Sequence, residues 1–218
     1  MRKLIVSEFL SFDGVMQAPG GVDEDTDGGF AHGAWFIPYW HDDIGGYFTE
    51  TLSQCDTLLL GRKTWQTHGA AFEPMSDDDP NNPFGAMSKV VVSTTLKDAS
   101  AWRNSTLIAE NVIEEVRKLK EQPGKDIFTD GSSVLVHTLA QHDLVDGYNF
   151  LVNPVVLGSG KRIFPAGLRV NLKLIECKPF PSGVVLMRYV PERYRRLGSM
   201  SLAAWASNDA VRRVFENL

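Results

Sequence analysis

The sequence predicts an α/β protein built on a mainly parallel sheet, with helices on both faces and an antiparallel edge. Strand-like and helix-like segments alternate along residues 3–157, which is typical of strand–helix–strand units with parallel strands. Residues 148–157 are almost continuously apolar, as expected for a strand buried on both faces. After Gly158, two further strand-like segments joined by a turn rich in proline and glycine predict a closing hairpin.

Local signals place the individual elements. Hydrophobic alternation and apolar runs predict strands at 3–11, 57–60, 89–93, 105–109, 126–129, 148–157, 171–178 and 184–190. Helical periodicity predicts helices at 44–54, from 63 onward, between Asn111 and Pro123, and at 132–141. Asn111 is placed to cap the third helix, with Glu114 at capping-box spacing. Turn dipeptides crowd residues 12–33 and predict a long, mobile loop after the first strand.

Composition describes an ordinary globular chain. With 218 residues, 43% hydrophobic and 22% charged, the sequence suits one large domain with a substantial core. A net charge of -5 and the lack of a basic run argue against nucleic-acid binding. No apolar run is long enough to span a bilayer, and the three apolar residues near the start are too few for a signal peptide. Cys55 and Cys177 are far apart and are expected to be buried, reduced thiols, so a cytoplasmic location is predicted.

Two segments share one pattern, in which an apolar strand leads through a glycine into the start of a helix. They are residues 57–65, with Gly61-Arg62-Lys63-Thr64, and residues 126–134, with Gly131-Ser132-Ser133. A helix N-terminus offers free N–H groups and partial positive charge, and glycine lets a phosphate approach the backbone closely. Two such turns on one sheet are what a pyrophosphate-bridged dinucleotide requires, although each one also occurs as a plain connector.

Several motifs together resemble those of the dihydrofolate-reductase-like superfamily in order and approximate spacing. They are Ser11-Phe12-Asp13-Gly14, residues 61–65, Val91-Val92-Ser93-Thr94, Asp130-Gly131-Ser132-Ser133 and residues 154–160. Within the superfamily, residues 2–190 resemble most closely the C-terminal reductase domain of the bifunctional riboflavin-biosynthesis deaminase-reductase. The resemblance implies a mixed eight-stranded sheet and bound NADPH. The expected organisation is a reductase domain at 1–191, followed by a C-terminal helical extension at 192–218 that the resemblance does not cover.

The resemblance also implies site residues. Asp13 lies by the substrate and is the candidate for proton delivery or for holding a substrate hydroxyl; the alternative is a simple turn former ahead of Gly14. The implied cofactor-binding residues are Val15, Met16, Gly61, Arg62, Thr64, Ser93, Thr94, Gly131, Ser132 and Ser133. Leu157, Gly158 and Gly160 are expected to line the substrate cleft, joined by Trp40 from an aromatic stretch that equally suits an ordinary core.

Two departures narrow the function. Dihydrofolate reductases carry a carboxylate on the first helix, but the matching position here falls at Gly45, which disfavours dihydrofolate as substrate. The zinc motif of the deaminase half is missing, and the five histidines show no metal-ligand spacing, so no metal site is predicted. The expected function is hydride transfer from NADPH to a small C=N or C=O substrate, with pyrimidine-ribityl or pterin-like compounds as candidates. The alternative is a nucleotide-binding or regulatory module without turnover.

The segment after residue 191 is expected to add a helix. Residues 202–218 show helical spacing, with Val211, Val214, Phe215 and Leu218 on one face. That face could pack on the chain's own core, but pairing with a second copy is the prediction made here, so a homodimer is expected.

Overall fold

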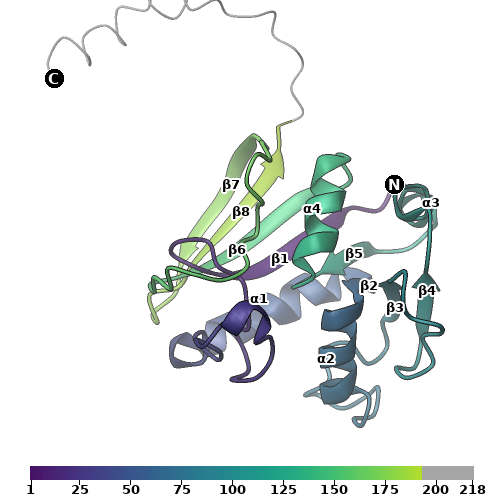
Figure 1. Cartoon of the computed structure of the whole chain (residues 1–218), viewed down its shortest axis with the longest axis horizontal. Helices are drawn as coiled ribbons and strands as arrows, with labels where there is room; N and C mark the ends of the chain where they lie inside the picture. Colours follow the sequence, from purple (N-terminus) through teal and green to yellow (C-terminus); the bar gives the residue numbers. More distant parts are fainter. Residues whose placement is uncertain (193–218) are drawn as a thin grey trace, which may run out of the picture.

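All strands of the computed structural model, which describes residues 1–192, belong to one eight-stranded sheet with the order β4-β3-β2-β5-β1-β6-β8-β7 (Figure 1). The predicted helix at 202–218 and its apolar face lie outside the described residues. The strands are β1 Leu4–Ser11, β2 Cys55–Gly61, β3 Ser88–Val92, β4 Ser105–Ile108, β5 Asp126–Thr129, β6 Gly147–Asn153, β7 Leu172–Pro179 and β8 Val185–Pro191.

The strand directions agree with the predicted fold class. Strands β1 to β6 pair in parallel, and β8 pairs antiparallel with both β6 and β7, which forms the closing hairpin. The parallel pairing of β1 with β5 ends at Val6 and Thr129, whereas the pairing of β1 with β6 continues to Ser11. The sheet therefore opens between β1 and β5 toward the carboxyl ends of these strands.

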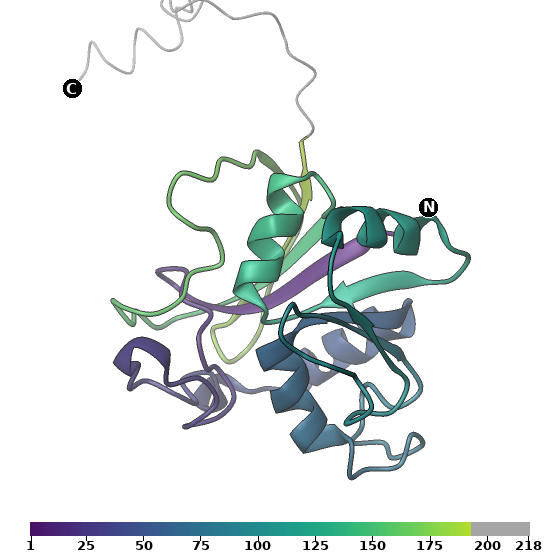
Figure 2. The same ribbon diagram turned by 45° about the vertical axis from the view of Figure 1, so that its right-hand side comes forward.

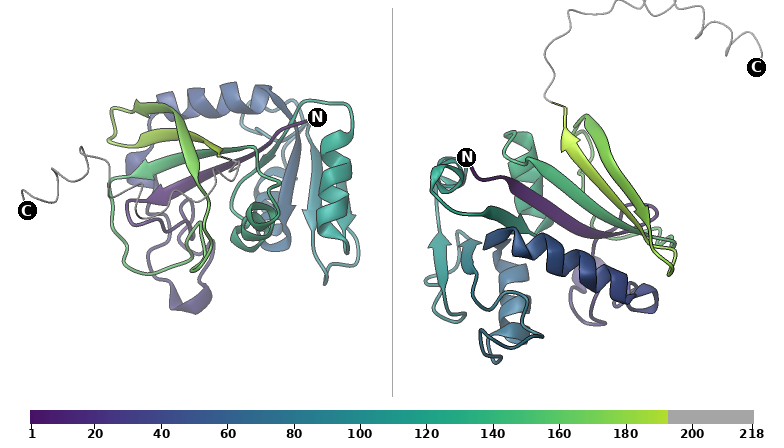
Figure 3. Two further views of the ribbon diagram at one scale, coloured as in Figure 1. Left: turned by 90° about the horizontal axis from the view of Figure 1, so that it is seen from above. Right: turned by 180° about the vertical axis from the view of Figure 1, so that it is seen from behind.

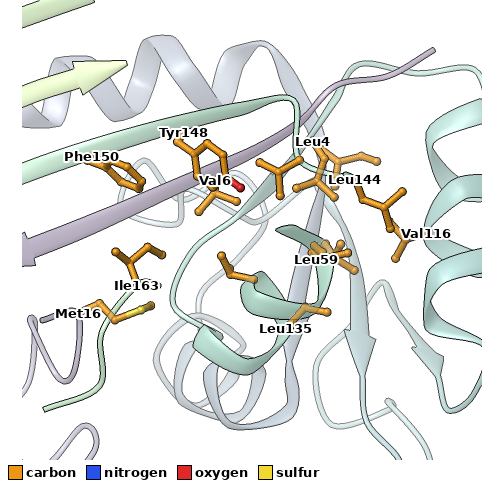
Figure 4. Close-up of a cluster of buried hydrophobic side chains, with 14 of the residues drawn as sticks. Leu4, Val6, Met16, Leu59, Val116, Leu135, Leu144, Tyr148, Phe150 and Ile163 are labelled. Atoms are coloured by element: carbon orange, nitrogen blue, oxygen red, sulfur yellow. The ribbon is translucent and has the colours of Figure 1, made fainter. Parts of the chain in front are cut away.

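Helices cover both faces of the sheet: α1 Asp42–Ser53, α2 Arg62–Phe72, α3 Val112–Glu121 and α4 Ser133–Gln141. Figure 3 shows α1 and α4 on opposite faces. On one face, Leu58 and Leu60 share an apolar cluster with residues of α1 and α2. On the other, Leu59 joins a cluster that includes Val116 of α3 and Leu135 of α4 (Figure 4). Alternate residues of β2 thus pack into two apolar clusters, one on each face of the sheet, as its buried apolar run predicted.

Local details correct three expectations. Asn111 takes a left-handed conformation with φ of 51°, and its side chain makes no capping hydrogen bond to α3. Strand β6 ends at Asn153, ahead of the predicted 157, because Pro154 cannot donate to the ladder. Cys177 is exposed on the edge strand β7, whereas Cys55 is buried as expected; both are free thiols. Among residues 1–192, no helix is long and apolar enough to cross a membrane.

Candidate functional site

A cleft of about 1210 Å³ runs along the edge where β1 and β5 separate. Its floor includes residues 7–9 of β1, and its walls come from α1, the start of α2 and the turn at 130–133. The loop between β1 and α1 closes one side with residues 16–20 and 23–27. Figure 2 shows this dark purple loop beside α2. The volume exceeds the roughly 300–1,000 Å³ typical of small-molecule sites, and a cleft at such a sheet edge is a usual ligand position.

The two glycine turns lie side by side, because β2 is the neighbour of β5. The Gly61 N–H donates to Ser132 Oγ at 2.8 Å, and the Ser132 N–H donates to Thr64 Oγ1 at 3.0 Å. A Cβ on Gly131 would lie 2.9 Å from Thr64 Cγ2 and Oγ1, so only glycine permits this approach. We call residues 61–64 and 130–133 together the double-turn cradle. The two turns that the sequence placed on one sheet are thus direct neighbours in the structure.

The N-terminus of helix α2, which forms part of the cradle, has no side-chain cap among the described residues. Gly61 occupies the N-cap position, and no side chain bonds to the N–H groups of the first turn. Arg62 donates to Gln66 Oε1 at 3.1 Å along the exposed face of the helix. The Lys63 ammonium pairs with the Asp27 carboxylate of the loop. The start of the helix therefore offers N–H groups without a side-chain cap and the Arg62 guanidinium, while the Lys63 ammonium is already paired.

Glu8 is a buried acid in the floor of the cleft, with only 4% of its surface exposed. Its Oε2 accepts the Gly131 N–H at 3.0 Å. Its Oε1 has no hydrogen-bond partner among the described residues. Burial, with a smaller contribution from the Asp130 carboxylate, raises the pKa of Glu8 well above its ordinary value. A neutral carboxyl group at this position can donate a hydrogen bond to a ligand.

Beside Glu8 stands an ion pair that also lines the cleft. His68 Nε2 of α2 lies 3.1 Å and 3.2 Å from the two carboxylate oxygens of Asp130. Its ring stacks on Phe84 with centroids 5.4 Å apart. Burial lowers the pKa of His68, but the Asp130 carboxylate outweighs this, and the pKa is raised overall. The Asp130 carboxylate thus favours the protonated form of His68, and an imidazolium there would balance the negative charge of Asp130.

The loop at 12–33 is held in place by the amide side chain of Gln17 and by ion pairs to two of its aspartates. Gln17 Nε2 donates to the carbonyls of Asp25 and Asp27 at 3.0 Å each, and Gln17 Oε1 accepts the Lys161 N–H at 3.0 Å. The Lys161 ammonium pairs with both carboxylates of the same aspartates. Lys161 and Lys63 together hold the pKa of Asp27 at about 2. The loop is thus clamped between α2 and the segment after β6.

Asp13 joins two loops and does not line the cleft. Its carboxylate accepts from Ser11 Oγ at 2.7 Å and from the N–H groups of Leu157 and Gly158 at 3.1 Å and 2.9 Å. These hydrogen bonds, with that from Ser11 the largest contribution, lower its pKa to about 2, so the carboxyl is ionised at neutral pH. A group in this state accepts hydrogen bonds and does not supply a proton. The carboxylate thus bridges the loop after β1 and the segment after β6, a role that is neither the predicted proton donor nor a purely local turn former.

The far end of the cleft is aromatic. Phe9 of β1 and Phe36 lie with ring centroids 3.8 Å apart, and Phe36 meets Trp40 edge-on at 5.9 Å. Trp40 is half exposed and lines the cleft with Phe48 of α1. A Cβ on Gly45 would meet the Trp40 ring at 3.4 Å. Among the described residues, α1 contributes no acid to the cleft lining.

The structure divides the predicted site residues into two groups. The cleft lining includes Met16, Trp40, Thr64, Gly131, Ser132 and Ser133. The remaining predicted site residues do not line it: Asp13, Val15, Gly61, Arg62, Ser93, Thr94, Leu157, Gly158 and Gly160. In the second group, Ser93 Oγ accepts the N–H groups of Thr95 and Leu96, and a Cβ on Gly160 would clash with Val15 at 2.6 Å.

Sequence reasoning missed Glu8, Gln17, His68 and Lys161. Only Glu8 left a signal, as the one charged residue of the strand Leu4–Ser11. The roles of Gln17, His68 and Lys161 depend on contacts with residues distant in sequence.

The sheet order and the edge cleft define an α/β protein of the dihydrofolate-reductase-like class. Residues 2–186 match the family described as RibD C-terminal domain, and the chain belongs to this family. The uncharacterized protein YyaP of Bacillus subtilis is 33% identical over 193 residues, which cover 86% of this chain and 94% of YyaP.

Two solved structures share the fold. A pyrimidine reductase-like protein from Corynebacterium diphtheriae has a TM-score of 0.59 and 11% identity, covering 88% of this chain and 93% of that one. A dihydrofolate reductase from Enterococcus faecalis complexed with NADP(H) has a TM-score of 0.57 and 16% identity, covering 87% and 96%. The expected fold and family are confirmed.

Proposed function

We propose that the chain is an NADPH-dependent reductase of the riboflavin-pathway type, which transfers a hydride to a small C=N or C=O substrate. The observation that carries the proposal is the composition of one cleft, with a double-turn cradle at one end and an aromatic wall at the other. Membership of the RibD C-terminal domain family supports the reductase class. The neighbour crystallised with NADP(H) supports a nicotinamide cofactor.

The cradle suits the phosphates of a dinucleotide. The uncapped start of α2, Arg62, and the close backbone approach at Gly131 are the features that favour a bound phosphate. When bound, the cofactor would supply the hydride. The residues of this chain would hold its phosphates, orient the nicotinamide and exclude water with the loop at 12–33. Ser93 and Thr94 are proposed for the 2′-phosphate because they follow β3, the neighbour of β2.

The substrate end suits a planar, uncharged group. Phe9, Phe36, Trp40 and Phe48 offer faces and edges on which a heterocycle can stack. Since α1 lends no carboxylate, a pterin would lose the group that recognises its ring, and a pyrimidine-ribityl compound is the better candidate. We propose that Asp13 acts here as a positioning residue, which sets the loops after β1 and β6 against each other. A reducing compartment, the cytoplasm, suits the exposed free thiol of Cys177.

Equilibrium binding of NADPH and NADH tests the proposal. We expect wild-type protein to bind NADPH at least about tenfold more tightly, because a charged hydrogen bond to the extra phosphate contributes roughly 1.5–3 kcal/mol. Arg62→Ala should remove most of that preference, while Lys173→Ala, a cation lost from the exposed edge strand β7, should leave it intact.

Equal wild-type affinities for the two dinucleotides would contradict the choice of NADPH. Consumption of NADPH is then followed with a panel of carbonyl and imine compounds, pyrimidine-ribityl compounds included. Tight binding with no oxidation of NADPH by any of them would favour the nucleotide-binding module over the reductase.

A further inference from the structure

Glu8, an acid on β1, contacts the double-turn cradle at the place where we propose that a phosphate binds. Of the N–H groups in the turn after β5, that of Ser132 is used to tie the turns together, and that of Gly131 donates to Glu8 Oε2 at 3.0 Å. The Gly131 N–H is therefore already engaged by the Glu8 carboxyl group, and a phosphate must compete with Glu8 for it. If Glu8 were ionised, two negative charges would compete for one donor in a buried site.

Within residues 1–192, no cation pairs with the Glu8 carboxyl group. The charged groups that act on it are the carboxylates of Asp130, from the turn after β5, and Glu24, from the loop after β1. His68 of α2 pairs with Asp130, and the residue opposite Glu8 on β6 is the uncharged Phe150. Lys63 and Lys161 are engaged with Asp27. The buried Oε1 without a partner is the atom on which a proton would give a donor for a ligand oxygen.

We propose that Glu8 admits a phosphate-bearing dinucleotide to the double-turn cradle only in its neutral form, so that binding takes up one proton when Glu8 starts ionised. The inference rests on the proposed function, because it takes NADPH as the ligand. Glu8 thereby makes the affinity of the site depend on pH, and it does so through binding, before any chemistry.

The direction of the pH dependence follows from the linkage between proton binding and NADPH binding. Below the pKa of Glu8 in the free protein, the group is already neutral, and the affinity for NADPH is independent of this residue. Above that pKa, the affinity for NADPH falls tenfold for each pH unit, because one proton must be taken up on binding. Burial raises the pKa of Glu8, so this dependence lies at higher pH than an ordinary carboxyl group would give.

The experiment is isothermal titration of the protein with NADPH between pH 7 and pH 9, in pairs of buffers with different ionisation enthalpies. The 2′-phosphate, with a second pKa of about 6, keeps its charge over this range. Wild-type affinity should fall as pH rises, approaching tenfold for each pH unit above the pKa of Glu8, with proton uptake rising toward one over the same range. Glu8→Gln should reduce the change to less than threefold and bind more tightly than wild type at pH 9. Asp23→Asn, which removes an exposed acid from the same cleft, should keep the wild-type dependence.

Other outcomes separate the two proposals. NADPH that binds without pH dependence or proton uptake overturns the role of Glu8 and leaves the reductase in place. No measurable NADPH binding overturns both. A dependence abolished by His68→Asn and kept by Glu8→Gln places the proton on the imidazole, which also overturns the proposal. Circular dichroism verifies the fold of each variant, and the uptake measured in wild-type protein tests the proposal without any substitution.

Discussion

Replacing Gly131 by alanine tests how closely the two glycine turns must approach. Gly131 has a φ of +56°, a left-handed conformation that alanine adopts at a cost of roughly 1–2 kcal/mol. The new Cβ would also lie 2.9 Å from Thr64 Cγ2 and Oγ1 on α2. Overpacking of this kind costs a further 1–3 kcal/mol, roughly. We therefore expect Gly131→Ala to lower the free energy of unfolding by about 2–5 kcal/mol.

A matched control separates the two contributions. Gly167 also has a positive φ, of +84°, but an added Cβ there meets nothing within 4 Å. Gly167→Ala should therefore cost only the conformational part, roughly 1–2 kcal/mol. In the double variant, Thr64→Ala removes both clashing atoms, so the effects of Thr64→Ala and Gly131→Ala should be less than additive by about 1–3 kcal/mol.

Urea denaturation followed by circular dichroism gives these differences from the transition midpoints, provided that the slope of each transition is unchanged. Equal destabilisation by Gly131→Ala and Gly167→Ala would refute the claim that close contact with Thr64 requires glycine at position 131. Additive effects in the double variant would refute it as well, because the clash would then play no part.

Two further predictions concern stability against pH and assembly. The pKa of Asp13 is lowered to about 2, so its contribution to stability is present above the carboxyl pKa of the unfolded chain and is lost as pH falls toward 2. Asp13→Asn should therefore lower the urea midpoint at pH 7, and the gap to wild type should close between pH 4 and pH 2; a gap that stays constant with pH would contradict the role in positioning. We also expect a homodimer, since the edge strand β7 exposes the apolar residues Leu174 and Ile175. Sedimentation that finds only a 24.2 kDa species at micromolar concentration would reject it.

The fold could be predicted from the sequence because local pattern and global arrangement agree. The predicted strand at 126–129 has the bounds of β5, and α4 begins at Ser133, one residue after its predicted start. Asn111 shows the limit of such signals. Its capping-box spacing is present, yet its backbone adopts the left-handed region and the side chain does not reach the helix. Cys177 shows another limit, since exposure on an edge strand depends on strand order and not on the residue itself.

The site could be predicted only in part, because its chemistry depends on partners distant in sequence. The glycine turns are local motifs, and their positions followed from strand and helix signals. Glu8 is buried by a turn 123 residues away, and His68 finds its partner 62 residues away. Asp13 was found by its motif, but its function depends on the N–H groups of Leu157 and Gly158, about 145 residues further on. No periodicity within a strand or helix reports such contacts.

One feature of the topology accounts for both the cleft and the unusual acid in it. Strand β1 keeps its pairing with β6 to Ser11, but its pairing with β5 ends at Val6. Beyond that point, the side of β1 that faces β5 has room for a ligand but lacks the ladder that would satisfy the next N–H group, that of Gly131. Glu8 accepts it. A carboxyl group that accepts this N–H must give up part of that role if an anion binds to the same donor. A proton on Glu8 makes this exchange possible, so pH-dependent binding that Glu8→Gln abolishes would place the bound anion at this opening in the sheet.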